Sequence, residues 1–161
     1  MTDTKEHLHD LLKDFSGAML TTRTAQGGLH ARPMTIAKLA DNEELYCATG
    51  LSSPKIAEIS NDPHVSVTFQ VTSEYAALYG VARVVRDRET IEKLWSETWR
   101  IWFAGGKDDA DLCLLAISPK SGEYWDNSGS RCVKYLFSGK KAVLQKSTPE
   151  TDDTQHAKVS L

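Results

Sequence analysis

The chain has 161 residues, of which 40% are hydrophobic and 25% are charged, and its formal net charge is −3. This length fits one domain, and the composition is typical of a globular protein with a hydrophobic core. The negative net charge argues against a protein that binds nucleic acid through its phosphates.

The cysteines and the N-terminus indicate a cytoplasmic protein. Cys47, Cys113 and Cys132 form no CxxC pair and no Cys/His metal spacing, so we expect reduced thiols. Residues 1–6 are polar, and no apolar run approaches the ~20 residues that span a bilayer. The sequence therefore predicts neither a signal peptide nor a membrane helix.

Hydrophobic periodicity predicts a short amphipathic helix followed by a series of strands. Apolar residues at helical spacing indicate the helix, which Asp3 would cap: Leu8, Leu11, Leu12 and Phe15. Apolar or alternating runs predict strands over residues 18–22, 29–39, 45–48, 65–71, 75–85, 112–117 and 123–125. Gly80 is expected at a bulge or a close backbone approach. A turn is expected over residues 118–122.

Two more helices are predicted between these strands. The first covers residues 55–59. The second begins after Asp87 and presents a broad face with Ile91, Leu94, Trp95, Thr98 and Trp102. For Trp95 and Trp99 we expect a packing role.

The pattern weakens beyond Asp126. Residues 133–144 fit a helix or a strand, and residues 146–157 are polar and expected to be mobile. We therefore predict one domain over residues 1–145 and a polar C-terminal tail over residues 146–161. The predicted fold class is mainly β, an antiparallel barrel of six or seven strands with short inserted helices.

The segment from Thr49 to Lys55 combines a helix start with hydroxyl groups and a cation. Pro54 suits the first helical position, which makes Ser53 the N-cap and leaves backbone N–H groups free to bind an anion. Lys55 in the first turn opposes the helix dipole, and a bound phosphate would remove that conflict. Taken alone, the segment fits an ordinary capped helix with a solvated lysine better.

The run Arg32-Pro33-Met34 places a proline inside a predicted strand, which marks a sheet edge or a bulge. Arg32 and Met34 would then share one face, although, taken alone, a surface edge strand with a solvated arginine explains them better. The acidic cluster Asp108, Asp109 and Asp111 lacks calcium-loop spacing and fits a solvated turn or a helix cap. No metal site or catalytic triad is predicted.

In their order and spacing, several stretches resemble the FMN-binding split barrels of the pyridoxamine 5′-phosphate oxidase-like family, and within it the bacterial general stress protein 26 group. The matching stretches are residues 31–34, 45–55, 65–69, 79–82, 102–109 and 123–126. The resemblance covers most of the chain to about Asp126.

The resemblance implies a split β-barrel homodimer with FMN at the subunit interface. It assigns Arg32, Pro33 and Met34 to a strand along the isoalloxazine ring and ribityl chain. It assigns the contacts to the ribityl hydroxyls and phosphate to the segment after the third strand: Ala48, Thr49, Ser52, Ser53 and Lys55. Trp102, Phe103 and Trp125 are the expected ring contacts from the partner subunit, with core or dimer packing as their alternative.

The function implied is that of an FMN-dependent oxidoreductase, with reduced nicotinamide as a candidate electron donor and no essential acid or base from the protein. The alternative is a non-catalytic protein that stores, buffers or senses FMN. Pyridoxamine phosphate oxidase activity is disfavoured, because Lys158–Leu161 lacks the Arg-rich, Pro-containing end of those enzymes. A barrel loaded with haem is a further alternative, for which no clear axial ligand stands out and His30 is left open.

Overall fold

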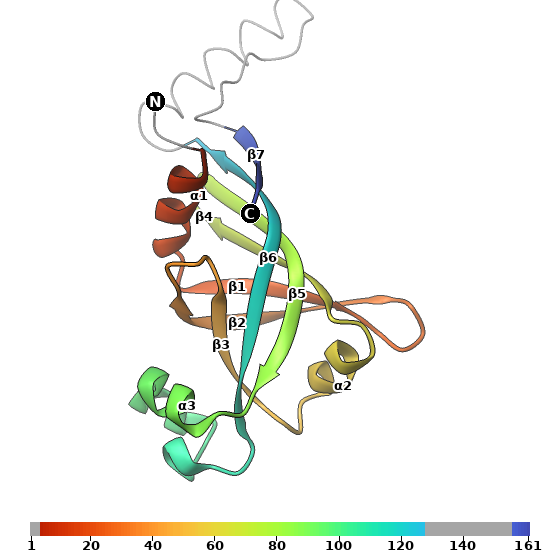
Figure 1. Ribbon diagram of the computed structural model, residues 1–161, viewed down its shortest axis with the longest axis vertical. Coiled ribbons are helices and arrows are strands. Elements are labelled where there is room, and N and C mark those ends of the chain that lie inside the picture. The colour runs from red at the N-terminus through yellow and green to blue at the C-terminus, as the bar shows by residue number, and fades with distance from the viewer. Residues whose placement is uncertain (1–3, 128–155) are drawn as a thin grey trace, which may run out of the picture.

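The computed structural model of the chain describes residues 4–127 and 156–161 (Figure 1). Its helices are α1 (Thr4–Lys13), α2 (Pro54–Asn61) and α3 (Arg88–Leu94), and its 3-10 turns are η1 (Glu97–Ile101) and η2 (Gly106–Asp108). Its strands are β1 (Gly17–Arg23), β2 (Leu29–Leu39), β3 (Leu45–Gly50), β4 (His64–Val71), β5 (Glu74–Val85), β6 (Leu112–Asp126) and β7 (His156–Ser160).

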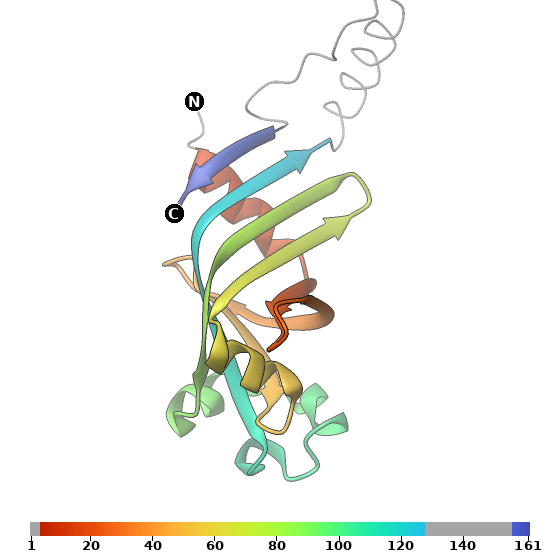
Figure 2. The same cartoon turned by 90° about the vertical axis from the view of Figure 1, so that its right-hand side faces the viewer.

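The strands form one antiparallel sheet that closes on itself. The strand order is β3-β2-β1-β4-β5-β6-β7, and a further ladder between β3 and β6 closes the first six strands into a barrel. One edge of β6 pairs with β5. The other edge pairs with β3 over Leu112–Ile117 and with β7 over Ser121–Trp125 (Figure 2). The predicted mainly β antiparallel barrel is therefore confirmed.

Strand β6 corrects one prediction. We expected two strands separated by a turn over residues 118–122, but the chain stays extended through Ser118 and Pro119. There the pairing with β5 shifts register between Tyr79 and Gly80, so the irregular residues form a bulge. A Cβ atom on Gly80 would lie 2.2 Å from the Ser118 carbonyl oxygen, which confirms the expected close approach.

The helix predicted after Asp87 is also shorter than expected. Asp87 caps it as predicted, accepting a hydrogen bond of 2.8 Å from the Thr90 backbone N–H. The helix then ends at Leu94, and η1 starts a separate 3-10 turn. Because of this break, Trp99 turns into the core with 4% of its surface exposed, whereas Trp102 remains 63% exposed.

The barrel core continues into helix α1. The four apolar residues predicted for this helix and its C-terminal end are all buried in the core cluster: Leu8, Leu11, Leu12 and Phe15. His7 Nε2 lies 3.1 Å from Asp126 Oδ2 and joins α1 to the end of β6. The proposed cap Asp3, the segment 133–144 and Cys132 lie outside the described residues.

Strand β7 was not predicted. Residues 156 and 157 were expected to be mobile, but they begin a strand paired with β6.

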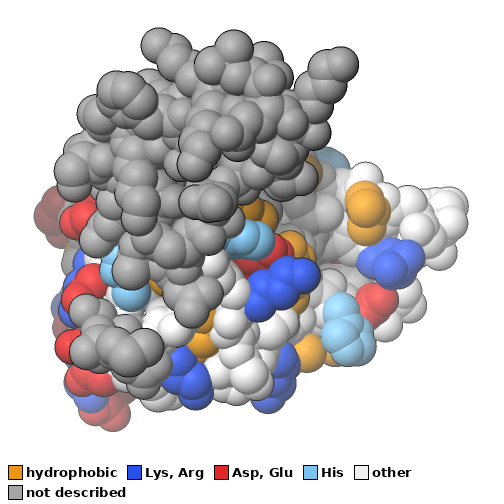
Figure 3. Space-filling view, turned by 90° about the horizontal axis from the view of Figure 1, so that it is seen from above, with side chains coloured by type: hydrophobic (Ala, Val, Ile, Leu, Met, Phe, Trp, Pro, Cys, Tyr) orange, Lys and Arg blue, Asp and Glu red, His pale blue; other side chains and the backbone are white. Residues whose placement is uncertain are grey.

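None of the helices in the described part of the chain has the length and hydrophobicity of a membrane span. From above, acidic, basic and histidine side chains are interspersed over the described surface (Figure 3).

Candidate functional site

A hollow of about 360 Å³ opens at the start of helix α2. Its polar end is formed by the end of β3, the start of α2, the chain between them and the residue before β6: Thr49, Gly50, Ser52, Ser53, Lys55 and Asp111. Its apolar end comes from β2, β3 and η1 with the residues after it: Met34, Ala48, Trp99, Trp102 and Phe103, beside Thr35. The structure thus brings Trp102 and Phe103 next to the hydroxyl and lysine segment.

Lys55 lies at the polar end with uncharged direct partners. Its Nζ donates hydrogen bonds to Thr49 Oγ1 at 2.9 Å and to Ser53 Oγ at 2.6 Å. The Lys55 pKa is lowered below 10.5, mainly because the ammonium is buried and secondly because of the positive charge of Arg32. A half-buried cation of this kind favours an anionic ligand, because the opposite charge would offset the cost of burying the ammonium.

The backbone around Lys55 supports the same conclusion. Ser53 is the N-cap of α2 with extended backbone angles, Pro54 starts the helix, and no acidic residue lies in its first turn. The Ser53 side chain makes no capping hydrogen bond, because it accepts from Lys55 instead. The helix start therefore combines a positive dipole end with a cation and hydroxyl groups.

Arg32 does not line this hollow, and its guanidinium binds the Glu58 carboxylate instead. Its Nη2 donates to Glu58 Oε2 at 2.6 Å, and its Nη1 donates to Thr22 Oγ1 at 2.6 Å. Glu58 also accepts from Thr22 and lies 3.0 Å from His30 Nδ1. Hydrogen bonds from Thr22, His30 and Arg32, in that order, lower the Glu58 pKa to about 2. The Arg32 charge is thereby balanced, and Lys55 is left as the cation facing the hollow.

A second hollow of about 780 Å³ lies on the outer face of β1, β4 and β5. It contains Pro33 and Trp125, and it shares Met34 and Thr35 with the first hollow. Trp125 stacks on His156 of β7, with ring centroids 5.0 Å apart and planes 9° apart. Trp125 is therefore separate from Trp102 and Phe103 in one subunit, although β2 connects the two hollows.

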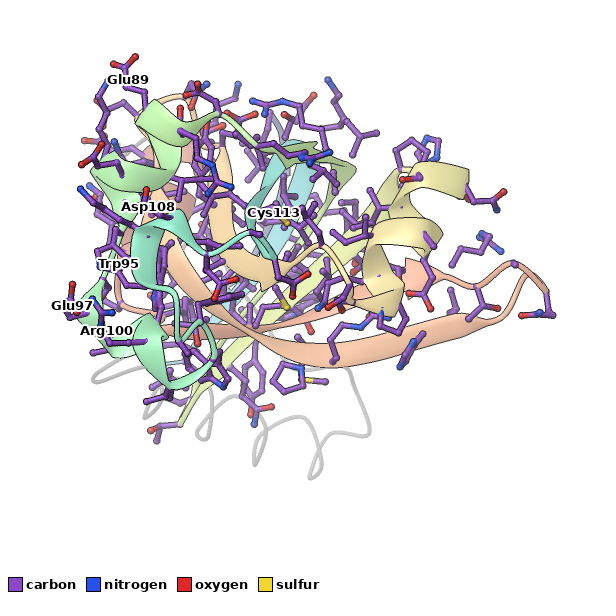
Figure 4. All side chains as sticks on the ribbon, turned by 90° about the horizontal axis from the view of Figure 1, so that it is seen from below. Glu89, Trp95, Glu97, Arg100, Asp108 and Cys113 are labelled. Carbon is purple, nitrogen blue, oxygen red and sulfur yellow. The ribbon has the colours of Figure 1, made fainter. Side chains whose placement is uncertain are left out.

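The packing role expected for Trp95 and Trp99 is confirmed. Their rings meet edge to face at 5.6 Å, and both belong to the cluster around Ile91. Arg100 lies over the Trp95 ring, and Glu97 accepts hydrogen bonds from both (Figure 4).

The two described cysteines are buried in neighbouring strands. Burial raises the pKa of Cys47 to about 12 and that of Cys113 to about 11, so both thiols are protonated at neutral pH. In residues 4–127 and 156–161, no cluster of His, Cys, Asp and Glu side chains is suited to a metal ion.

Sequence reasoning missed Asp111 at the hollow. Asp109 forms the expected turn, because its carboxylate accepts from the Gly105 and Asp111 backbone N–H groups at 3.0 Å each. The Asp111 carboxylate instead accepts from the backbone N–H and the hydroxyl of Ser52. Ser52 and Asp111 lie 59 residues apart in the sequence, so no local sequence pattern predicts their contact.

The sequence and the fold of the chain match known proteins. The family described as pyridoxamine 5′-phosphate oxidase like matches residues 3–150. The chain belongs to the pyridoxamine 5′-phosphate oxidase-like family. Within it the chain falls in the general stress protein 26 group. General stress protein 26 of Bacillus subtilis is 31% identical over 123 residues, covering 73% of this chain and 85% of that protein.

Solved structures of this family show the same fold. A Jannaschia protein assigned to general stress protein 26 superposes with a TM-score of 0.74 at 29% identity, covering 100% of both chains. A general stress FMN/FAD binding protein from Xanthomonas citri superposes with a TM-score of 0.68 at 25% identity, covering 80% of this chain and 92% of that one.

Proposed function

We propose that this member of the pyridoxamine 5′-phosphate oxidase-like family binds FMN with its phosphate at the polar end of the smaller hollow. The half-buried Lys55 ammonium with only hydroxyl partners carries this proposal, because a phosphate would supply the missing negative charge. Thr49 and Ser53 offer hydroxyl groups around it, and Ser52 lines the same hollow with its hydroxyl donated to Asp111. The description of the Xanthomonas citri relative as an FMN/FAD binding protein supports a flavin ligand.

The apolar end of the same hollow suits the flavin ring. Met34 and Ala48 line it from the barrel, and Trp102 and Phe103 line it from η1 and the residues that follow. Pro33 continues this surface into the larger hollow. Arg32 takes part indirectly, since its bond to Glu58 fixes the helix that carries Lys55.

The larger hollow supports a homodimer. Its apolar rim includes exposed side chains on β1 and β5: Met19 at 41%, Tyr75 at 38% and Tyr79 at 45%. Exposed aromatic and methionine side chains gathered on one face are typical of an interface. A second copy on this face would bring its own residues, with Trp125 as the candidate, towards the flavin at β2.

The reaction that fits such a site is electron transfer. Bound FMN supplies hydride or electron chemistry, for which NADH or NADPH is the candidate donor. The protein residues bind the phosphate, orient the ring and exclude water from its apolar side. Neither described cysteine near Lys55 is ionised at neutral pH, so thiolate chemistry has no part in this proposal.

The absorption spectrum of the purified protein, before and after addition of FMN, tests the proposal. A preparation that stays colourless and takes up no FMN would disprove it. If FMN binds, anaerobic NADH or NADPH is expected to bleach the flavin. Binding without bleaching by either donor would favour the non-catalytic alternative, a protein that stores, buffers or senses flavin.

A further inference from the structure

Asp111 connects the start of β6 to the segment that precedes α2. Its Oδ1 accepts a hydrogen bond from the Ser52 backbone N–H at 2.8 Å, and its Oδ2 accepts from the Ser52 hydroxyl at 2.9 Å. Its backbone carbonyl accepts from the Leu51 N–H at 2.7 Å. Three hydrogen bonds from one residue therefore hold residues 51 and 52 against the barrel.

Gly50 leaves room for this carboxylate. A Cβ atom at residue 50 would lie 2.3 Å from Asp111 Oδ2, closer than unbonded atoms approach. Any larger residue would force the carboxylate away from Ser52 and break its hydrogen bonds. Gly50 and Asp111 therefore act as a pair, one supplying the space and the other the acceptors.

A carboxylate is electrostatically unfavourable beside a phosphate. Asp111 lines the same hollow as Lys55, so its charge opposes the ligand that Lys55 attracts. The presence of Asp111 is explained by geometry, since its two carboxylate oxygens accept from the two donors of Ser52, the backbone N–H and the hydroxyl. Asp111 is itself held by its backbone N–H bond to Asp109 Oδ1, so the acceptors are fixed in place.

We propose that Asp111 is a positioning residue that holds the phosphate-binding segment in its binding shape through Ser52, by hydrogen-bond geometry and not by charge. This inference rests on the proposed FMN site. A segment already held in its bound shape does not lose conformational freedom when the phosphate binds, which raises the affinity. In this proposal Asp111 acts through Ser52 and makes no contact of its own with the phosphate.

Titration of unliganded protein with FMN, followed by flavin fluorescence, tests the inference with two substitutions. Asp111→Asn keeps one acceptor for the Ser52 N–H and can donate to the Ser52 oxygen, while it removes the charge. It is expected to bind FMN as tightly as the unsubstituted protein, or more tightly. Asp111→Ala removes both acceptors and is expected to weaken FMN binding about tenfold or more.

Each result is decisive. Equal or tighter FMN binding by Asp111→Ala would overturn the inference, because Asp111 would then either have no effect on the affinity or lower it. Equally weak binding by both variants would overturn it as well, because charge would then matter. If the unsubstituted protein binds no FMN, the proposed function itself fails, which separates the two cases. Thermal unfolding of each unliganded variant establishes that it is folded.

Gly50→Ala provides an independent test through a double-mutant cycle. Alone it is expected to weaken FMN binding, because the new Cβ displaces the Asp111 carboxylate. In the Asp111→Ala background that clash is removed, so the added loss is expected to be smaller. Strictly additive losses of affinity would contradict the proposed pairing of Gly50 with Asp111. The cycle requires that Gly50→Ala and the double variant fold.

Discussion

The Arg32 guanidinium lies 2.6 Å from Glu58 Oε2, and this pair joins strand β2 to helix α2. Arg32 is 14% exposed in its side chain and Glu58 is 13% exposed, so solvent screens the pair only weakly. Because Lys55 lies in the first turn of α2, the pair fixes the position of this cation at the proposed phosphate site. Its loss would affect both stability and flavin binding.

Glu58→Gln is expected to remove an acid-sensitive part of the stability. The folded pKa of about 2 lies below the ordinary value of 4.5, so this stabilisation is present above pH 4.5 and is lost as the pH falls towards 2. The free energy of unfolding should change by at most about 3 kcal/mol over that window. Chemical denaturation between these pH values measures it.

Glu89→Gln is the matched control, because Glu89 forms an exposed pair with Lys93 on α3. Its acid profile should follow that of the unsubstituted protein. If Glu58→Gln also keeps that profile, Glu58 does not carry the stabilisation.

Lys55→Glu is expected to weaken FMN binding by about 1.5–3 kcal/mol or more, because it removes a charge-assisted contact and adds repulsion. In the unsubstituted protein, affinity should fall as the pH rises through the lowered Lys55 pKa, below 10.5, because the lysine then loses its charge. Fluorescence titrations across alkaline pH measure this. Lys55→Arg stays charged and should show a flatter profile, and identical profiles would place the phosphate elsewhere.

Two tryptophans of the same segment, which both line the hollow, should differ in their effect on stability. Trp99→Ala creates a cavity in the core and should lower the free energy of unfolding by about 3–5 kcal/mol. Trp102→Ala changes a side chain that is 63% exposed and should alter stability by only about 0.5 kcal/mol. Its FMN affinity should nevertheless fall, because Trp102 lines the hollow. Unchanged affinity would exclude Trp102 from the site.

Gly80→Ala should destabilise the barrel by about 1–3 kcal/mol, because the new Cβ overlaps the β6 backbone. The overlap is with the Ser118 carbonyl oxygen at 2.2 Å and the Pro119 Cα at 2.7 Å. Gly17→Ala is the control, since its Cβ would meet the Met34 carbonyl oxygen at an ordinary 3.7 Å. Urea unfolding of both variants gives the comparison, and equal stabilities would contradict the close approach.

Tyr79→Glu is expected to convert the proposed dimer into a monomer. The substitution places a charge among the exposed apolar side chains around the larger hollow, where a second copy would bury it. Light scattering after size-exclusion chromatography measures the mass. Lys93→Glu, on the exposed side of α3, should leave the mass unchanged, and a Tyr79→Glu dimer would place the interface on another face.

The sequence predicted most strands well because the alternation of apolar and polar residues that marks them is a local pattern. The second strand was predicted over residues 29–39, as observed, and the clean alternation of residues 65–71 identified β4 to within one residue. The helix start at Pro54 was also predicted from the local sequence, whereas the assignment of its hydroxyl and lysine residues to a phosphate came from the family resemblance. These features depend on neighbours in the chain, so a local pattern reveals them.

The remaining features depend on distant partners. Turn-forming residues at 118–122 stay in β6 because β5 pairs along the whole strand and Gly80 leaves room for the bulge. Strand β7 exists because β6 offers it an edge. Nothing in the sequence connects Arg32 to Glu58 or Asp111 to Ser52, because each pair joins residues that lie far apart in the chain.

The position of β6 in the chain has a consequence for synthesis. It pairs with both β3 and β5, and it is the last of the six barrel strands to leave the ribosome. Until residues up to Asp126 have emerged, β3 and β5 each keep an unpaired edge, which is prone to pairing with other chains. Closure then joins segments far apart in sequence, a slow step in folding. Nascent chains cut short before β6 should therefore be the most aggregation-prone form of this protein.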